Sequence, residues 1–174
     1  RDTLTFADAL KYVLRQDPDC ILIGEMRDLE TIQLAITAAE TGHLVIGTLS
    51  TSSAPKTVER IIDSFPAKEQ NQIRTMLSEA LKAVITQRLI PAADKTRLTL
   101  ALEILIGTLP MINLIRDAKT FQIPSMMQTG KKDGMVIMDE SIMALMQAGK
   151  ITAKDAAANA NRQEKFNPFL DKAH

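Results

Sequence analysis

The sequence predicts an α/β fold, in which a βαβ unit with a mostly parallel sheet is followed by a small helical subdomain. Short apolar runs at Cys20–Ile23 and Leu44–Leu49 predict two strands, and the apolar residues between them have helical spacing. Two strands joined by one helix pair in parallel, with a right-handed crossover. From Gly107 onward the segments are short, helical and rich in methionine. We expect an α/β part at 1–106, a helical subdomain at 107–165 and a tail at 166–174.

Length and composition exclude several classes of protein. The 174 residues, 45% of them apolar, suffice for one domain with a substantial core. Because 21 basic residues balance 21 acidic ones, no overall positive field favours nucleic acid or an anionic membrane, and we expect no nucleic-acid partner. No apolar run approaches the roughly 20 residues that span a bilayer. The chain opens at Arg1 without an initiator methionine, which suggests a piece of a longer protein.

The N-terminal segment is predicted to be a helix that Thr5 caps and that runs to about Arg15. Its apolar positions are Phe6, Ala9, Leu10, Val13 and Leu14. Pro18 ends the helix, because proline disfavours the helical conformation in the residue before it. The run from Cys20 to Ile23 then predicts a buried strand with a polar tip. Cys20, the single cysteine, excludes an internal disulfide, which fits a reducing, cytoplasmic setting.

A second helix is predicted from Asp28, its N-terminal cap, to about Glu40. Its buried face is expected to comprise Leu29, Ile32, Ala35, Ile36 and Ala39. Thr41 and Gly42 end this helix, since glycine is the usual residue after a helix C-terminus.

The second strand, Leu44–Leu49, ends in four small hydroxyl residues, Ser50–Ser53. These hydroxyls can face a phosphate or cap the helix that follows Pro55, and capping is the more common role. Hydrophobic spacing predicts two further helices and then a β-hairpin. These elements are expected at Lys56–Ser64, Ala67–Ala83, Val84–Ile90 and Arg97–Ile106, with a loop at Pro91–Thr96.

The last third of the sequence is predicted to be helical. Helices are expected at Pro110–Asp117, Ile123–Thr129, Asp139–Ala148 and Thr152–Asn161. The methionines of this region are predicted to fill its core, and a methionine-rich groove for a partner is the second interpretation. They are Met126, Met127, Met135, Met138, Met143 and Met146. Phe166–His174 is expected to be a frayed tail.

Glu25 is the candidate catalytic residue, because it lies just beyond the first strand, where ligand chemistry collects in open α/β sheets. A carboxylate there can orient a metal-bound water or take its proton; the plainer interpretation is a solvated loop residue or a helix cap. His43 stands alone before the second strand, where a histidine is more often structural, and His174 is terminal. One cysteine and two histidines give no metal-ligand spacing. The sequence also lacks the GxxxxGK[ST] motif, whose loop binds phosphate in P-loop proteins.

Two motifs, separated by one helix, carry a resemblance to a known family. ILIGEMRD, at 21–28, resembles an atypical Walker B motif, and TGHLVIGTLSTSSA, at 41–54, resembles a histidine box. Both lie within 14–66, and the resemblance continues through QNQIRTMLSEALKAVITQRLI and EILIGTLPMINLIRD. In this order the motifs resemble those of the type IV pilus retraction ATPases, the PilT family of motor ATPases, over nearly the whole chain.

The resemblance implies a partial RecA-like P-loop ATPase core followed by a helical C-terminal subdomain, working as a homo-hexameric ring. It implies ATP and Mg²⁺ as cofactors of the full-length protein. It places the motor in the cytoplasm at the inner membrane, where it drives pilus retraction and twitching motility. The partners it implies are the inner-membrane pilus platform protein and a paralogous motor ATPase.

Carried over by position, the resemblance makes Glu25 the Walker B glutamate, which acts on the attacking water and, through water, on Mg²⁺. Gly24 would let the backbone approach phosphate, and Arg27 and Asp28 would hold the loop and its charges. His43 would be the first histidine of the box, near the γ-phosphate. The residues so assigned to nucleotide binding or sensing are Gly24, Arg27, Asp28, Gly42, His43 and Ser50.

The sequence departs from the family pattern in three places. Ser50 stands where the family has the second histidine of TLHT, and a hydroxyl cannot carry its positive charge. The retraction-linked helix AIRNLIRE appears as Pro110–Asp117, with Ile112 in place of the first arginine. Its retained residues are Asn113, Leu114, Ile115 and Arg116. The Walker A loop, the acidic box and a PAS-like domain would precede Arg1, so these residues alone are expected to bind nucleotide poorly and to be inactive.

Three functions follow from these observations. The leading hypothesis is the C-terminal half of a hexameric motor ATPase for type IV pilus retraction. The second, which Ser50 and Ile112 motivate, is a non-hydrolysing accessory subunit of the pilus motor. The third is a related type II secretion ATPase.

Overall fold

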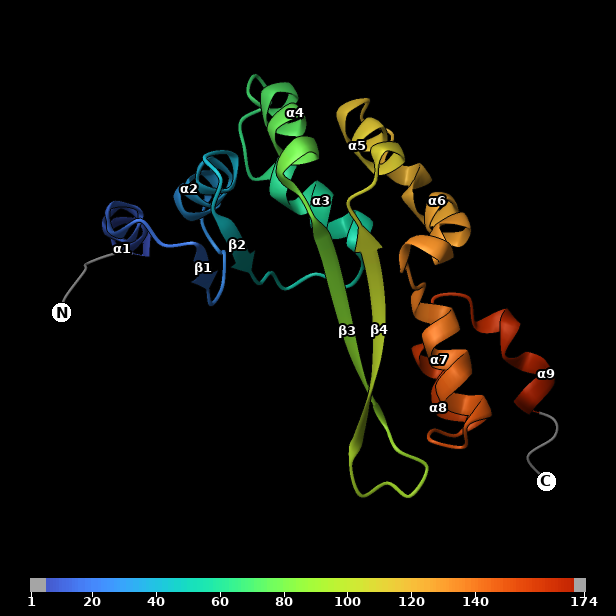
Figure 1. Cartoon of the computed structure of the whole chain (residues 1–174). Coiled ribbons are helices and arrows are strands. Elements are labelled where there is room, and N and C mark those ends of the chain that lie inside the picture. The colour runs from blue at the N-terminus through green and yellow to red at the C-terminus, as the bar shows by residue number, and fades with distance from the viewer. Residues whose placement is uncertain (1–5, 171–174) are drawn as a thin grey trace. The chain divides into compact units, whose positions relative to one another are not determined.

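The computed structural model describes residues 6–170, which form two compact units (Figure 1). Thr5, Arg1 and His174, for which the sequence predicts a cap, a chain start and a tail, lie outside the described residues. The first unit runs to Thr51 and adds Pro55–Lys82 and Thr108–Thr120; the second comprises Ser52–Ala54, Ala83–Gly107 and the chain from Phe121 onward. Each unit contains residues from both sides of position 106. The domain boundary expected at that position stays a prediction.

The first unit contains a βαβ element, as predicted. Its strands β1 (Cys20–Ile23) and β2 (Leu44–Gly47) pair in parallel, with Cys20 opposite Leu44 and Ile23 opposite Gly47. Helix α2 (Leu29–Glu40) connects them, and α1 (Phe6–Val13) precedes them. The second strand is two residues shorter than predicted.

One face of this small sheet is covered and the other is exposed. Ile21 and Ile23 are buried against Ala35 and Ala38 of α2. Side chains alternate along a strand, so the remaining positions face away from α2. Leu22 is 74% exposed, and Cys20, Leu44 and Ile46 are exposed as well. The prediction of two buried strands, with Cys20 in the first of them, was therefore wrong for this face: among residues 6–170, β1 and β2 form a two-stranded sheet of their own.

Asp28 caps α2, as predicted: its Oδ1 accepts a hydrogen bond from the Thr31 backbone N–H at 2.8 Å. The buried face of α2 differs from the expected one at its edges. Leu29 is exposed and Ala39 half-buried. The buried positions are Thr31, Ile32, Ala35, Ile36 and Ala38.

Three further helices belong to the first unit, namely α3 (Ala54–Asp63) from Pro55 onward, α4 (Gln70–Ala80) and α5 (Leu109–Arg116). Helix α3 begins two residues earlier than predicted, and α4 is shorter than predicted at both ends. Helix α4 packs against α2 and α5. Within residues 6–170, no helix is both long and apolar enough to cross a membrane.

The second unit is built on the predicted β-hairpin. Strands β3 (Ala83–Pro91) and β4 (Leu98–Ile106) pair antiparallel, and the helices that accompany them are α6 (Ile123–Thr129), α7 (Met138–Gln147), α8 (Ala153–Asn159) and α9 (Asn167–Leu170). The core joins hairpin and helices. It comprises Ile90, Ala101, Met138, Ile142, Ile151, Ala156 and Phe166.

Two predictions about this unit have opposite outcomes. The methionines fill core space: Met127, Met135 and Met138 are buried, and Met143 and Met146 pack against the core. The expected frayed tail was wrong for its first residues, because Phe166 is fully buried and α9 follows it. An aromatic side chain of this size removes a large apolar area from water when buried, which explains why residues 166–170 pack on the unit.

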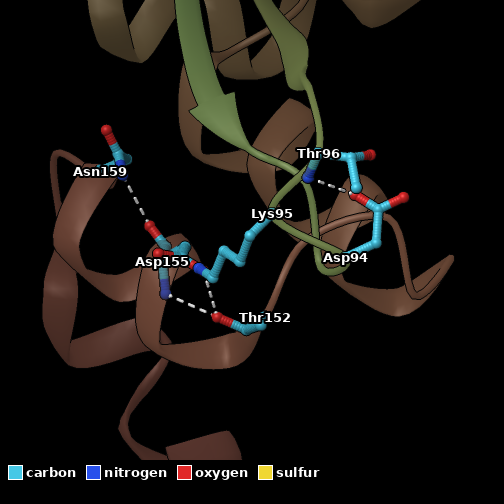
Figure 2. A network of polar contacts seen from close by, with 6 residues as sticks. All are labelled: Asp94, Lys95, Thr96, Thr152, Asp155 and Asn159. Carbon is cyan, nitrogen blue, oxygen red and sulfur yellow. Dashed lines mark hydrogen bonds and ion pairs between the residues drawn. The ribbon is translucent and has the colours of Figure 1, made fainter.

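The loop of the hairpin is fastened to the start of α8 (Figure 2). Lys95 Nζ lies 2.5 Å from Asp155 Oδ2, and the Asp155 backbone N–H donates to Thr152 Oγ1 at 3.1 Å, so Thr152 is the N-terminal cap of α8. The Thr152 hydroxyl also donates to the Asp155 carboxylate. Lys95, and then the Thr152 hydroxyl, lower the pKa of Asp155 below its ordinary value. The Lys95–Asp155 ion pair thus joins the loop to the capped first turn of α8.

Candidate functional site

The loops that follow β1 and β2 are joined at the carboxyl edge of the sheet. The Met26 backbone N–H donates to the Thr48 carbonyl at 2.9 Å, and the Thr48 hydroxyl donates to the Gly24 carbonyl. Parallel pairing brings these strand ends to the same edge, and the two bonds hold the loops in register beyond the last paired residues. Glu25 lies between the two residues that are held.

Both oxygens of the Glu25 carboxylate have donors. Arg27 Nη2 lies 2.6 Å from Oε2, and Ser50 Oγ donates to Oε1 at 3.3 Å. Arg27 comes from the loop after β1 and Ser50 from the loop after β2. The Glu25 side chain is 34% exposed, so the carboxylate is oriented by the chain and still open to solvent.

The charge of Glu25 is stabilised at this edge. The hydrogen bond from Arg27 lowers the pKa of the Glu25 carboxyl; partial desolvation opposes this effect, while the Arg27 charge and the Ser50 hydroxyl add to it. The same contact raises the pKa of Arg27. Glu25 is therefore ionised at neutral pH, in the form that accepts a hydrogen bond from water and can take its proton.

A glycine of β2 makes room for this loop. A Cβ atom on Gly47 would lie 2.8 Å from Met26 Cε and 2.9 Å from Met26 Sδ, too close for an ordinary contact. A side chain at position 47 would therefore displace the flexible end of Met26. Gly47 was missed as a site-supporting residue, although a glycine inside a strand is a sequence signal of close approach.

Two of the other predicted residues at this edge have different surroundings. Both Asp28 oxygens are engaged by Thr31, through its N–H at 2.8 Å and its hydroxyl at 2.9 Å, and these bonds lower the pKa of Asp28. Asp28 thus acts as a helix cap. A Cβ on Gly24 would meet nothing within 4 Å, so packing within the chain does not require this glycine. An approach of phosphate to Gly24 stays a prediction.

The structure does not bring His43 to Glu25. His43 precedes β2, whose amino end is marked by the bond from Leu44 N–H to the Asp19 carbonyl at 3.0 Å. Glu25 lies beyond the other end of the sheet, and the four-residue rise of β2 is about 13 Å. His43 Nδ1 lies 3.0 Å from the Ala38 carbonyl. That contact needs a proton on Nδ1, which leaves Nε2 of the neutral ring as an acceptor.

Gly42 has a conformational role beside His43. Its φ is +104°, in the region that favours glycine, and it follows the C-terminal residues of α2. The turn that begins strand β2 therefore requires Gly42. The sensing roles of Gly42 and His43 stay predictions.

The retained residues of the predicted retraction-linked helix lie on α5. Ile115 is fully buried, and Leu114 and Ile112 are half-buried. Arg116 Nη2 donates to Asn113 Oδ1 at 2.6 Å. Ile115 is accordingly part of the core of the first unit, while Asn113 and Arg116 offer the polar groups of this helix.

The oxygen atoms at the carboxyl edge suit Mg²⁺, but only Glu25 supplies a carboxylate among them. Carboxylate and hydroxyl oxygens are the hard ligands that Mg²⁺ prefers, and Glu25, Thr48 and Ser50 supply them. Within residues 6–170, however, no three acidic, histidine or cysteine side chains group in a way that could hold a metal ion. A single carboxylate suits an ion that keeps its waters and is held mainly by substrate phosphates.

Comparisons with known proteins agree with this architecture. The family model described as "Type II/IV secretion system protein" matches residues 1–162. The type IV pilus retractation ATPase PilT of Pseudomonas aeruginosa is 52% identical over 166 residues, which cover 95% of this chain and 48% of that protein. The twitching motility protein of Neisseria gonorrhoeae is 52% identical over 165 residues, which cover 95% of this chain and 44% of that protein.

A solved structure gives the same result. The crystal structure of the pilus retraction motor PilT with bound ADP matches with a TM-score of 0.86 and 43% identity, over 97% of this chain and 47% of that one. The chain thus spans less than half the length of each of these relatives. The fold is that of part of the PilT ATPase, and the chain belongs to the type II/IV secretion system protein family, among its PilT-type ATPases.

Proposed function

We propose that the full-length gene product containing these residues is an ATP-hydrolysing motor subunit for type IV pilus retraction. Residues 6–170 would supply part of its nucleotide site, with Glu25 as the Walker B glutamate. The observation that carries this proposal is the position of the Glu25 carboxylate, held at the carboxyl edge of a parallel strand pair by Arg27 and Ser50. The names of the relatives and the ADP bound to a structural relative support it.

Phosphoryl transfer requires mainly positioning and charge stabilisation, which this edge can provide. The Glu25 carboxylate would accept a hydrogen bond from the attacking water, orient it and take up its proton. Ser50 would keep Oε1 in place during this step, because it donates from the neighbouring strand end. Mg²⁺, when bound with the nucleotide, neutralises phosphate charge, and Glu25 would reach it through one of its waters.

The assembly belongs to the same proposal. The subunit would work in a homo-hexameric ring in the cytoplasm, at the inner-membrane pilus machine, with the platform protein as partner. Asn113 and Arg116 on α5 would take part in coupling to retraction. The similarity to PilT supports this assignment.

One observation favours a second function, a non-hydrolysing accessory subunit of the motor. Ser50 provides a hydroxyl where the family pattern has a histidine, and a hydroxyl cannot supply positive charge to the transition state. The subunit would then bind partners in the ring without turnover.

Steady-state ATP hydrolysis by the full-length protein distinguishes the two functions. We expect turnover that Glu25→Gln lowers about 100-fold or more, the usual contribution of a general base, with ATP still bound. Glu69→Gln is the matched control, because Glu69 is a half-buried glutamate, like Glu25, and is paired with a basic residue, Lys68, at 3.7 Å in the loop before α4. Unchanged turnover in Glu25→Gln would remove Glu25 from the mechanism. ATP binding without turnover in the unsubstituted protein would favour the accessory subunit.

A further inference from the structure

Resting on the proposed function, we propose that Arg27 exchanges partners in each ATP cycle. In one state Arg27 pairs with Glu25, and with ATP bound it pairs with the γ-phosphate. Glu25 is thereby released to the attacking water only when the phosphate to be transferred is present. In this scheme Arg27 binds the γ-phosphate itself, and it makes the site discriminate ATP from ADP.

The present contact occupies the group that catalysis needs. Arg27 Nη2 lies 2.6 Å from Glu25 Oε2, so one oxygen of the candidate base is engaged by a cation. The other oxygen accepts from Ser50 at 3.3 Å. A water molecule bound to this carboxylate has to share it with both donors, and the charged donor is the stronger of the two.

The Arg27–Glu25 ion pair is also easily broken. The Arg27 side chain is 79% exposed, and ion pairs with this exposure contribute little to stability because water and salt compete for both partners. Ser50, by contrast, belongs to a loop that is held to the Gly24 loop through Thr48. Loss of the Arg27 contact therefore leaves the Glu25 carboxylate with one fixed donor.

A terminal phosphate is a better partner for Arg27 than a single carboxylate. It carries more charge, and its oxygens match the planar guanidinium in a bidentate way. Arg27 lies two residues beyond Glu25 in the same loop, so a phosphate next to the attacking water is close to both side chains. When the γ-phosphate leaves, Arg27 returns to Glu25, whose carboxylate it can reach at 2.6 Å.

A double-mutant cycle on nucleotide affinity tests the exchange without any need for turnover. The full-length protein and its Glu25→Gln, Arg27→Gln and doubly substituted variants are titrated calorimetrically with AMP-PNP and with ADP, at fixed Mg²⁺ and salt. Glu25→Gln should tighten AMP-PNP about two- to fivefold, the size of one lost competing surface ion pair. Arg27→Gln should weaken AMP-PNP about tenfold, the size of one charged hydrogen bond. ADP affinity should stay unchanged in all variants.

The diagnostic result lies in the double variant. Glu25→Gln should no longer tighten AMP-PNP once Arg27 is glutamine, because no guanidinium remains to be released. Arg27→Lys, which keeps the charge but not the planar fork, should give an intermediate affinity. Glu69→Gln should change neither affinity.

Two results would overturn the exchange while leaving the proposed ATPase intact. One is an equal effect of Glu25→Gln in both Arg27 backgrounds, and the other is an equal effect of Arg27→Gln on AMP-PNP and ADP. Absence of AMP-PNP binding by the unsubstituted protein would instead overturn the proposed function, and the exchange with it. Thermal unfolding of each variant checks that the fold is retained, which we expect for side chains as exposed as Arg27.

Discussion

Two carboxylates in this chain are held by the same kinds of partner, a basic side chain and a hydroxyl. Glu25 in the first unit has Arg27 and Ser50, and Asp155 in the second has Lys95 and Thr152. In both places the basic side chain is the main cause of a lowered carboxyl pKa. Side-chain chemistry alone therefore does not distinguish them.

Their backbones do distinguish them. Asp155 lies in the first turn of α8, its own N–H is bound by the Thr152 hydroxyl, and its carbonyl accepts from Asn159 at 2.8 Å (Figure 2). Its side chain is 20% exposed. Glu25 lies in a loop beyond a strand and uses its side chain alone. A carboxylate tied into a helix start is a structural joint, whereas one that ends a strand is available to a substrate.

The largest expected effect is on stability, from the core of the second unit next to Asp155. Phe166 is fully buried in the core that Ile151 and Ala156 share. Phe166→Ala should lower the free energy of unfolding by about 3–5 kcal/mol, as large-to-small core changes do. Urea unfolding measures this, with exposed Phe121→Ala as the matched control. A change below 1 kcal/mol would mean that residues near 166 form a frayed tail after all.

Replacement of each carboxylate by the matching amide should affect turnover in one region and stability in the other. Glu25→Gln should lose about 100-fold or more in ATP turnover, with unfolding free energy within about 0.5 kcal/mol of the unsubstituted protein. Asp155→Asn should show the opposite, a loss of stability with turnover retained. Paired ATPase and denaturation measurements on the full-length protein check both. Similar profiles for the two variants would break the comparison.

Removal of each hydroxyl sharpens the same contrast at a smaller scale. Thr152→Ala should cost about 1 kcal/mol of stability, because α8 loses its N-terminal cap, and Thr152→Ser should restore most of it. Ser50→Ala should leave stability unchanged and lower turnover, since Ser50 orients Glu25 and caps no helix. Denaturation midpoints of the three variants are the measurement; a stability loss in Ser50→Ala would contradict the assignment.

The smallest effect is a pH dependence of stability at the Asp155 joint. The folded-state pKa of Asp155 is lowered, first by Lys95 and then by Thr152. Its contribution is therefore present above the unfolded-state pKa, about 3.9, and is lost as the pH falls through the lower folded-state pKa. The stability deficit of Asp155→Asn should accordingly be larger at pH 7 than in acid. An equal deficit at both pH values would show that the charge of Asp155 does not matter.

The sequence was sufficient for the parts of the fold that depend on local pattern. Helix α2, its Asp28 cap, the parallel pairing of β1 with β2 and the β3–β4 hairpin were all predicted from spacing and turn residues. The meeting of the Glu25 and Ser50 loops also follows, because parallel strands end at one edge. Because His43 precedes β2 and Glu25 follows β1, the two residues lie at opposite edges of the parallel pair.

Other contacts join residues whose separation in sequence hides them. Glu103 is buried and accepts from the Ala54 N–H at 2.7 Å, 49 residues away, and no periodic signal marks such a pair. The burial of Phe166 depends on the hairpin and α8 together. Arg27 folds back on Glu25 because the loop conformation allows it, and the motif alone does not specify this.

The uncovered face of the β1–β2 sheet offers a spectroscopic handle. Cys20 is exposed there, next to the exposed Leu22, and it is the single thiol of the 174 residues. A maleimide dye attached to it would report on the strand that leads directly to Glu25. If Cys20 is labelled rapidly in the 174-residue chain but slowly in a longer version of the protein, the rest of the polypeptide covers this face.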